Sequence, residues 1–351
     1  MVSTGNKQEV RVKRGVDGPS GRMWYKNTGT CGEHERSVMD EQRREWLFGE
    51  KRRAELALIG ITVIWGLTFT FTKKSLAELQ PFVFLAWRFI LAFAVMLVLC
   101  AGRLKKMNLP TVGAGVLLGL LLMGSYAFQT FGLKYTTAGN AGFITGLFIV
   151  FTPLLAAIFL KHKQSPRSIV AVVVALIGLG FLSIAPGFHI SVGDALVLVC
   201  AFTYSVHIIF LDGYTKKYDL PLLVMVQMGV LAFGNTILGL GFESFKLPST
   251  GYVWMSVIVC GLFASALAFY VQGYAQKVLT PSRTSMVLIM EPVFSLIFGM
   301  ILLSERLSWR GWVGCALILA GMLITEIPIA FLKGGRGETA EGEADAELIQ
   351  I

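Results

Sequence analysis

The sequence has little charge for its length. Only 15% of its 351 residues are Asp, Glu, Lys or Arg, whereas 54% are hydrophobic and 25 are phenylalanine. Soluble globular domains have about a quarter charged residues. The balance therefore excludes an ordinary soluble protein and indicates a polytopic membrane protein.

Cysteine is also scarce, and its spacing excludes two kinds of site. The five cysteines are Cys31, Cys100, Cys200, Cys260 and Cys315. They show no CxxC pair, and all but Cys31 lie inside apolar runs. Neither a zinc site nor a disulfide framework is indicated. We expect no metal and no cofactor.

Two further absences narrow the function. The net charge is +9, but no basic groove with interleaved aromatic residues occurs, so we expect no nucleic-acid partner. No Walker motif or other ATP-binding signature is present either. Any energy for work across a membrane must then come from an ion or solute gradient.

Long apolar runs recur from residue 54 onward. Each is about 20 residues long, enough for a helix that crosses a hydrocarbon core of roughly 30 Å. In lipid a segment must satisfy its own backbone hydrogen bonds, which favours helices. The sequence predicts an all-α integral membrane protein with ten transmembrane helices, at 54–73, 81–101, 111–133, 138–160, 168–185, 194–213, 221–242, 250–273, 284–303 and 309–331.

The flanking segments are polar. Residues 1–53 are predicted to be a disordered basic tail, with helix formation around 40–53, and residues 332–351 an acidic tail. Lys and Arg are more frequent in the loops that share a side with the amino terminus. This bias predicts that both termini lie in the cytoplasm. We expect the plasma (inner) membrane as the location.

The two halves of the membrane part resemble each other in sequence. "FTPLLAAIFLKHKQSPRSIVAVVVALIGLGFL" near 151–182 parallels "MEPVFSLIFGMILLSERLSWRGWVGCALILAGML" near 290–323. Both segments have a proline in an apolar run, a short polar turn and a final run of small residues. Five helices in each half, 54–185 and 194–331, predict two inverted repeats, the plan of many secondary transporters.

Several stretches resemble one family. "WGLTFTFTKKSL" from Trp65, "WRF" at 87–89, "TTAGNAGFITGLFIVFTPLL" at 136–155, "EPVFSLIFGMILLSERL" at 291–307 and "GWVGCALILAGMLI" at 311–324 are similar to EamA-type transporters of the drug/metabolite transporter superfamily. The resemblance covers 54–331. It implies a ten-helix carrier of small organic solutes with a central cavity. The turn Lys161-His162-Lys163 departs from the family, which often has a Glu there.

Glu291 is the main candidate for a functional group. It lies seven residues into the run 284–303, near the middle of the bilayer, where a charge costs about 2.5–3.5 kcal/mol on insertion scales. Pro292 should kink this helix because it cannot donate to the carbonyl of Leu288. Glu291 either couples transport to a proton or a cationic solute, or braces the kink. Pro153 occupies the matching place in the first half, so both prolines are predicted hinges.

Arg88 is a second charge inside a predicted span. It either holds a solute carboxylate or snorkels or pairs within the protein. Lys73 either anchors the first helix at the interface or reaches the cavity. His207 is the only histidine in a predicted span, and it either relays protons or packs.

Other polar and aromatic residues complete the predicted binding site. Tyr126 and Gln129, and Tyr204 and His207, share helix faces. Each of these residues either contacts solute or makes an interhelical hydrogen bond: Trp65, Tyr126, Gln129, Asn140, Thr145, Tyr204, Tyr270 and Gln272. Gly139, Gly142 and Gly146 predict close packing of the fourth helix.

The sequence therefore predicts a secondary transporter, not an enzyme. It would move amino acids or related small metabolites, with export as the expected direction, by alternating access; proton coupling is one of the two roles that Glu291 leaves open. A membrane-embedded enzyme is one alternative, but it needs titratable groups that converge at membrane depth. A non-transporting sensor or scaffold that uses the tail 1–53 is another.

Overall fold

The computed structural model describes residues 14–17, 22–25, 33–159, 166–183, 191–279, 284, 287–288 and 290–326. They belong to two compact units, Met1–Glu50 and Lys51–Ile351. In the first, β1 (Arg14–Asp17) pairs antiparallel with β2 (Arg22–Tyr25). These strands lie within the tail that the sequence predicts to be disordered, and the helix expected around 40–53 is part of α1. The acidic tail 332–351 and the turn 161–163 lie outside the described residues.

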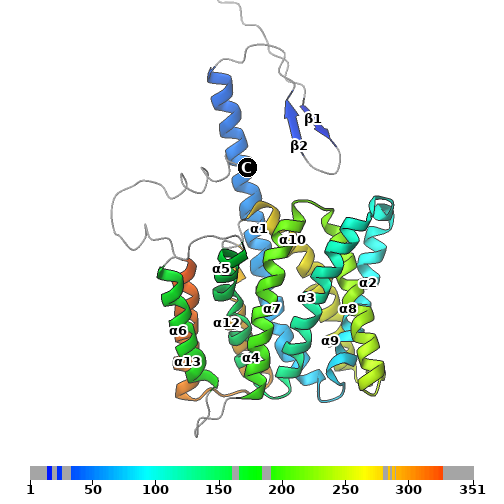
Figure 1. Cartoon of the computed structure of the whole chain (residues 1–351), viewed down its shortest axis with the longest axis vertical. Coiled ribbons are helices and arrows are strands. Elements are labelled where there is room, and N and C mark those ends of the chain that lie inside the picture. Colours follow the sequence, from blue (N-terminus) through cyan, green and yellow to red (C-terminus); the bar gives the residue numbers. More distant parts are fainter. Residues whose placement is uncertain are drawn as a thin grey trace, which may run out of the picture. The chain divides into compact units, whose positions relative to one another are not determined.

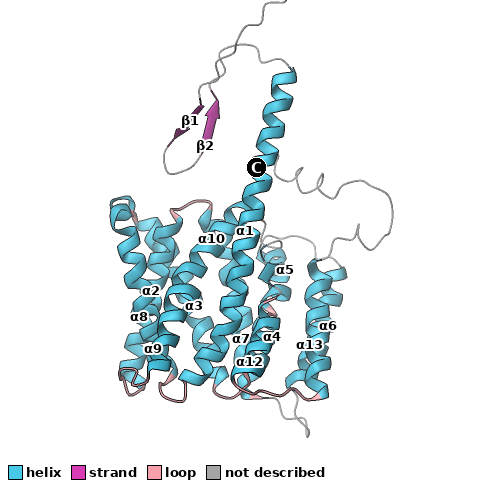
Figure 2. Cartoon of the chain, turned by 180° about the vertical axis from the view of Figure 1, so that it is seen from behind, coloured by secondary structure: helices cyan, strands magenta, loops and turns pink. Residues whose placement is uncertain are grey.

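Helices build the second unit, and they run side by side with their loops at the two ends of the bundle (Figures 1 and 2). They are the part of α1 (Glu33–Ser75) from Lys51 onward, α2 (Pro81–Cys100), η1 (Ala101–Lys106), α3 (Leu109–Leu133), α4 (Ala138–Thr145), α5 (Phe148–Phe159), α6 (Pro166–Ser183), α7 (Val192–Thr215), α8 (Leu220–Phe242), α9 (Gly251–Ile258), η2 (Val259–Leu267), α10 (Ala268–Val278), α12 (Glu291–Leu302) and α13 (Trp309–Glu326).

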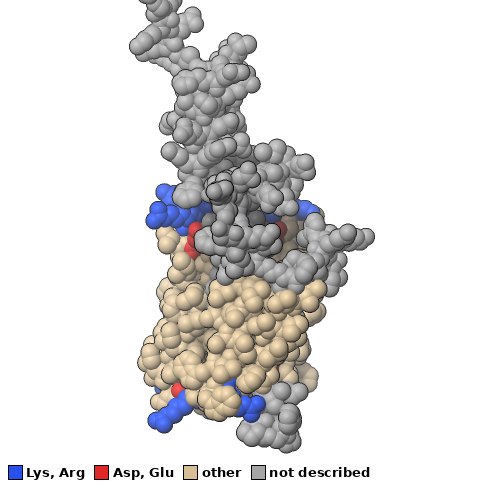
Figure 3. Space-filling model, turned by 90° about the vertical axis from the view of Figure 1, so that its left-hand side faces the viewer, with Lys and Arg blue, Asp and Glu red and all other residues tan. Residues whose placement is uncertain are grey.

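Seven apolar segments among the described residues are long enough to cross a membrane: Gly49–Ser75, Pro81–Lys106, Leu109–Leu133, Ala138–Ala156, Val192–Thr215, Leu220–Phe242 and Gly251–Val278. Three shorter apolar helices accompany them, at Ile169–Leu182, Glu291–Leu302 and Trp309–Ile324. On the face in Figure 3, uncharged side chains cover the middle of the bundle and Lys and Arg gather toward its two ends. This distribution is typical of a multi-pass membrane protein.

Two of the predicted helices differ from the expectation. The predicted helix 138–160 is divided into α4 and α5, with Gly146 and Leu147 between them. Helix α12 begins at Glu291, so Pro292 lies in its first turn and not in mid-helix as the sequence predicts. Proline suits a first turn because it has no N–H to donate and a helical φ. Pro153 does lie inside α5.

Helix pairing follows the internal repeat. Helix α2 packs against α8, α4 against α12 and α6 against α13. Each pair joins helices that hold the same place in the two halves of the chain. Helices α6 and α13 lie side by side at one edge of the bundle in both views, and α2 and α8 at the other (Figures 1 and 2).

Close approach of α4 and α12 depends on glycine, as the sequence predicts. A Cβ on Gly142 would lie 1.7 Å from Oγ and 2.4 Å from Cβ of Ser295. A Cβ on Gly146 would lie 2.5 Å from Cγ of Pro292. No side chain fits at either position, so small residues let these two helices come together.

Polar contacts join α2 to α8 at both ends of the pair. The backbone N–H of Val83, in the first turn of α2, donates to Oε2 of Glu243 at 3.0 Å. At the other end, Arg103 forms an ion pair with Asp219 at 3.1 Å, and Asp219 also caps α8. Both carboxylates lie at helix amino termini, where they offset unpaired N–H groups.

Candidate functional site

A small cavity lies at the centre of the bundle. Its volume is about 40 Å³, and side chains from α1, α3, α4, α7 and α12 line it: Trp65, Thr68, Leu122, Ser125, Tyr126, Gln129, Thr145, Cys200, Tyr204 and Glu291. Six of the eleven residues that the sequence predicts to bind solute are among them. The structure thus brings together Trp65, Tyr126, Gln129, Thr145, Tyr204 and Glu291 from five different helices.

Helical spacing explains why these residues share one cavity. Leu122, Ser125, Tyr126 and Gln129 follow one another at intervals of three, one and three residues, which places them on one face of α3. Cys200 and Tyr204 are four apart on α7. Four lining residues were not predicted, although each lies three or four residues from a predicted one on the same helix face: Thr68, Leu122, Ser125 and Cys200.

Aromatic rings give one wall of the cavity a fixed form. The indole N–H of Trp65 donates to the carbonyl of Ala264 at 2.9 Å, which holds the ring between α1 and η2. Tyr204 meets Trp65 edge to face at 6.3 Å and Phe148 at 5.1 Å. Such edge-to-face contacts are favourable for aromatic pairs and restrict their orientation.

Glu291 is the one acidic residue among the side chains that line this cavity. Glu291 is 4% exposed, and its Oε2 is buried with no hydrogen-bond partner among the described residues. The aligned residue in the first half, Thr152, satisfies its hydroxyl by donating to the carbonyl of Phe148 at 2.7 Å. A charged carboxylate that is buried without a partner is expensive. A proton or a cationic solute group in the cavity can neutralise Glu291.

Arg88 lies beside the cavity and is satisfied within the protein. It is 2% exposed, so it does not snorkel to the surface. Its Nε donates to Oγ of Ser265 at 2.9 Å, and its Nη2 donates to the hydroxyl of Tyr126 at 3.1 Å. The guanidinium carbon also lies 4.6 Å from the centre of the Tyr126 ring, a cation–π distance. Arg88 therefore acts on the cavity through Tyr126.

Besides Arg88, four predicted site residues do not line this cavity. His207 is fully buried, and its Nε2 is 2.9 Å from Oε1 of Gln227. Gln272 is also buried and accepts a hydrogen bond from the Tyr204 hydroxyl at 3.2 Å. Tyr270, two residues from Gln272, is 40% exposed because side chains two apart point to different sides of a helix. Asn140 lies in a second cavity.

This second cavity is larger, about 670 Å³, and lies where α1, α3, α4, α6, α7 and α13 come together. Its lining is mostly polar: Lys73, Lys134, Tyr135, Thr136, Thr137, Asn140, Phe181, Leu182, Ser191, Asp194, Ser308, Trp309 and Arg310. The ammonium of Lys73 donates to the backbone carbonyls of Leu133, at 3.0 Å, and Thr136. Lys73 thus reaches a cavity, but not the central one.

Glu305 has a structural position that the sequence analysis did not anticipate. The backbone N–H groups of Ala138 and Gly139 donate to its two carboxylate oxygens at 2.7 and 3.0 Å. Glu305 follows Ser304, whose φ of 54° lies in the left-handed region that glycine usually takes. This turn at the end of α12 points the Glu305 side chain at the amino terminus of α4. The contact links the two halves of the chain, the half-repeats.

Metal binding finds no support in the described part of the chain. No group of three or more His, Cys, Asp or Glu residues lies close enough there to hold an ion. The described cysteines are free and buried: Cys100, Cys200, Cys260 and Cys315. The geometry suits reversible binding of a small molecule with both polar and aromatic parts.

Comparisons with known proteins agree with this arrangement. The EamA-like transporter family matches the chain twice, at residues 52–184 and 191–327. An uncharacterized transporter of Archaeoglobus fulgidus is 31% identical over 279 residues, 79% of this chain and 86% of that protein. The uncharacterized transporter YcxC of Bacillus subtilis is 25% identical over 292 residues, 78% of this chain and 93% of that one. A solved crystal structure has the same fold, with a TM-score of 0.60 at 20% identity over 78% of this chain and 96% of that one.

Proposed function

Because the chain belongs to the EamA-like transporter family, we propose that it is a secondary transporter that moves small organic metabolites by alternating access. Amino acids or related solutes are the proposed cargo, and export is the proposed direction. The family and the named relatives support transport rather than catalysis.

The proposed topology has ten membrane spans in two inverted five-helix repeats, 54–185 and 194–331, with both termini in the cytoplasm of a plasma membrane protein. Seven long and three shorter apolar helices supply the spans. The two family matches divide the chain at nearly the same place. The pairing of α2 with α8, α4 with α12 and α6 with α13 is the packing expected around a pseudo-twofold axis.

Alternating access is supported by the size of the central cavity. A volume of about 40 Å³ holds a few water molecules at most, since a cavity needs roughly 10–15 Å³ of such volume for one water. Pockets for drug-sized ligands are about 300–1,000 Å³. The structure then corresponds to a closed conformation, and solute enters when helices separate at one end of the bundle.

The observation that carries the proposal is the unpartnered carboxylate oxygen of Glu291 in this cavity. A hydrogen-bonded brace would leave no buried oxygen without a partner, so the geometry favours coupling over bracing. The Glu291 carboxylate can take a proton or the ammonium of a solute. The Tyr126 hydroxyl, held by Arg88, and the aromatic wall suit the polar and apolar parts of an amino acid.

Transport in proteoliposomes tests this function. The purified protein is assayed against a panel of amino acids and related metabolites, with the pH gradient and the membrane potential set separately. We expect a pH gradient to drive net transport of at least one solute. Absence of transport for the whole panel under both gradients would contradict the proposed cargo class.

A Glu291→Gln variant tests the role of the carboxylate. If Glu291 carries the proton, the variant loses transport driven by the pH gradient but retains solute exchange. If it binds the solute ammonium, both activities fall. Glu243→Gln is the matched control, because Glu243 is a carboxylate at the end of the bundle, away from the cavity. An unchanged rate and pH dependence in Glu291→Gln would rule out either role.

A further inference from the structure

Helices α7 and α10 pack against each other along a contact surface that we call the seam. A row of polar groups, the file, runs along this seam from the central cavity. On α7, Cys200, Tyr204, Ile208 and Asp212 are each four residues apart and share one face. On α10, Gln272 meets Tyr204 and Gln276 donates from Nε2 to the carbonyl of Ile208 at 3.3 Å. From Cys200 to Asp212 the file extends about 18 Å at 1.5 Å per residue.

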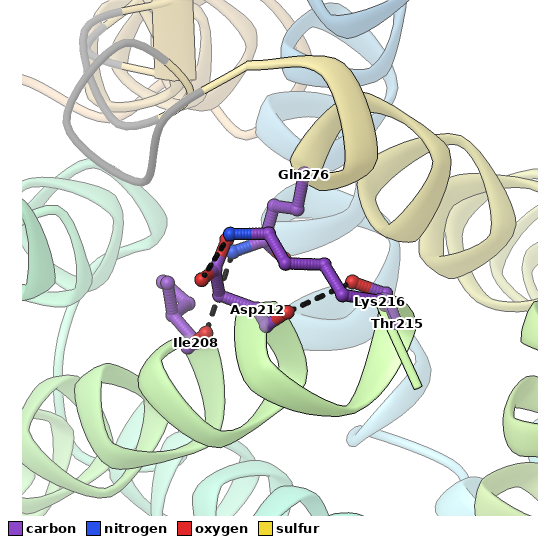
Figure 4. Close-up of polar contacts among 5 residues, drawn as sticks. All are labelled: Ile208, Asp212, Thr215, Lys216 and Gln276. Carbon is purple, nitrogen blue, oxygen red and sulfur yellow. Dashed lines mark hydrogen bonds and ion pairs between the residues drawn. The ribbon is translucent and has the colours of Figure 1, made fainter. Parts of the chain in front are cut away.

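The outer end of this file is shown in Figure 4. Gln276 reaches from α10 to Ile208, and Lys216 reaches back along α7 to Asp212, with Nζ 3.0 Å from Oδ2. The hydroxyl of Thr215 donates to the carbonyl of Asp212 at 3.1 Å. The seam therefore ends at a charged group that is 56% exposed, the Lys216 side chain.

Three buried polar atoms in this seam have no partner among the described residues: Nε2 of Gln272, Oε1 of Gln276 and Oδ1 of Asp212. A buried polar group without a hydrogen bond is unfavourable, and water restores the bond when it enters. Three such atoms along one seam mean that hydration offsets part of the free energy of separating α7 from α10.

The internal repeat places an equivalent seam at the opposite end of the bundle. Residues 126–137, "YAFQTFGLKYTT", align with 269–280, "FYVQGYAQKVLT", so Gln129 matches Gln272 and Leu133 matches Gln276. In the first half, Lys73 of α1 closes against the Leu133 carbonyl of α3. Gln129 donates to Thr145 at 3.3 Å, so its amide nitrogen has a partner, unlike that of Gln272.

We propose that the seam between α7 and α10 is the mouth through which the central cavity opens toward the Lys216 end of the bundle. Gln272, Gln276 and Asp212 form the polar lining of this mouth, which admits water and the hydrophilic part of the solute. The seam between α1 and α3, closed by Lys73, serves the other end. This inference rests on the proposed transport function and names the path that it uses.

A native cysteine allows a direct test. Cys200 lines the central cavity at the inner end of the file. In a full-length chain with the other four cysteines replaced by alanine, a membrane-impermeant cationic methanethiosulfonate is applied to proteoliposomes from each side separately. A Lys217→Cys variant of the cysteine-free chain identifies the Lys216 side, because Lys217 is exposed there. We expect the reagent to label Cys200 from that side.

Gln276→Leu should then slow this labelling from the Lys216 side alone, by on the order of tenfold, since a closed seam with one fewer unpartnered polar atom opens less often. Asn235→Leu is the matched control. Asn235 of α8 is likewise a buried amide whose oxygen has no partner among the described residues, but it donates within its own helix, to the carbonyl of Leu231, and lies outside the seam. It should leave labelling unchanged from both sides.

A double-cysteine variant distinguishes closure of the seam from a folding defect. Cysteines at Ile208 and Gln276, joined by a short bifunctional thiol reagent, should block labelling of Cys200 from the Lys216 side and preserve it from the other. Equal slowing from both sides, or no labelling of Cys200 from the Lys216 side, would overturn the proposal. Labelling needs no solute, so a failure of the transport assay with normal sided labelling would reject the cargo and not the mouth.

Discussion

Replacement of Gly142 by alanine is the sharpest test of how the two half-repeats meet. A Cβ at this position would lie 1.7 Å from Oγ and 2.4 Å from Cβ of Ser295, which is itself fully buried. Side-chain rotation can move Oγ away but not Cβ. Helices α4 and α12 must therefore separate locally.

The expected loss is about 1–3 kcal/mol, the usual range when an added methyl group forces backbone shifts in a packed interior. The measurement is thermal unfolding in detergent, followed by a fluorogenic maleimide that reacts as the buried cysteines become exposed: Cys100, Cys200, Cys260 and Cys315. We expect Gly142→Ala to expose these thiols at a lower temperature than the native chain.

Two comparisons separate crowding from a general intolerance of alanine. A Cβ on Gly124, in α3, would meet nothing within 4 Å, so Gly124→Ala should leave stability unchanged or raise it by up to about 1 kcal/mol. Ser295→Gly should rescue Gly142→Ala in a double-mutant cycle, because it removes both close atoms. An unchanged midpoint for Gly142→Ala, or no rescue in the double variant, would refute the packing argument.

Two further predictions concern the ends of the bundle. Glu305→Ala should lower stability by about 1–2 kcal/mol, since it removes the carboxylate that caps α4, whereas Arg306→Ala in the same turn should have little effect. Hydrogen bonds from the Thr250 hydroxyl and the backbone amide of Ser249 lower the pKa of Glu78 to about 2. The ionised Glu78 carboxylate therefore stabilises the fold at pH values above its unfolded pKa of 4.5, and this stabilisation is lost as the pH falls toward 2. The difference in unfolding midpoint between the native chain and Glu78→Ala should thus be constant from pH 8 to 5 and narrow below about 4.5; a difference that already varies between pH 8 and 6 would contradict this assignment.

Much of the candidate site could be predicted from residue type and spacing. A carboxylate at bilayer depth, Glu291, stands out because charge there is costly unless a wet cavity or a partner receives it. Tyr126 and Gln129 were found by their common helix face, and the structure places both in the cavity. Gly142 and Gly146 were found by their small size, and α12 does pack against them.

Three features differ from what the sequence predicts. Tyr270 was grouped with Gln272, yet only Gln272 faces the interior. Pro292 was assigned to a kink, yet it lies in the first turn of α12. Glu305 was not predicted to have a role, although it caps a helix that begins 167 residues earlier in the chain. For Glu305 the deciding contact comes from a helix that is distant in sequence, whereas the exposure of Tyr270 follows from the helical period of its own helix.

By itself the sequence determined that this protein is a bundle of apolar helices with a repeated plan, because backbone groups in lipid must bond within their own segment and apolar runs of that length do so as helices. It also determined which residues share a face, since the helical period is constant. Only the tertiary structure decided how each helix is rotated about its axis. Packing against distant helices sets that rotation. It satisfied Thr152, and it left Oε2 of Glu291 and three polar atoms of one seam without a partner among the described residues.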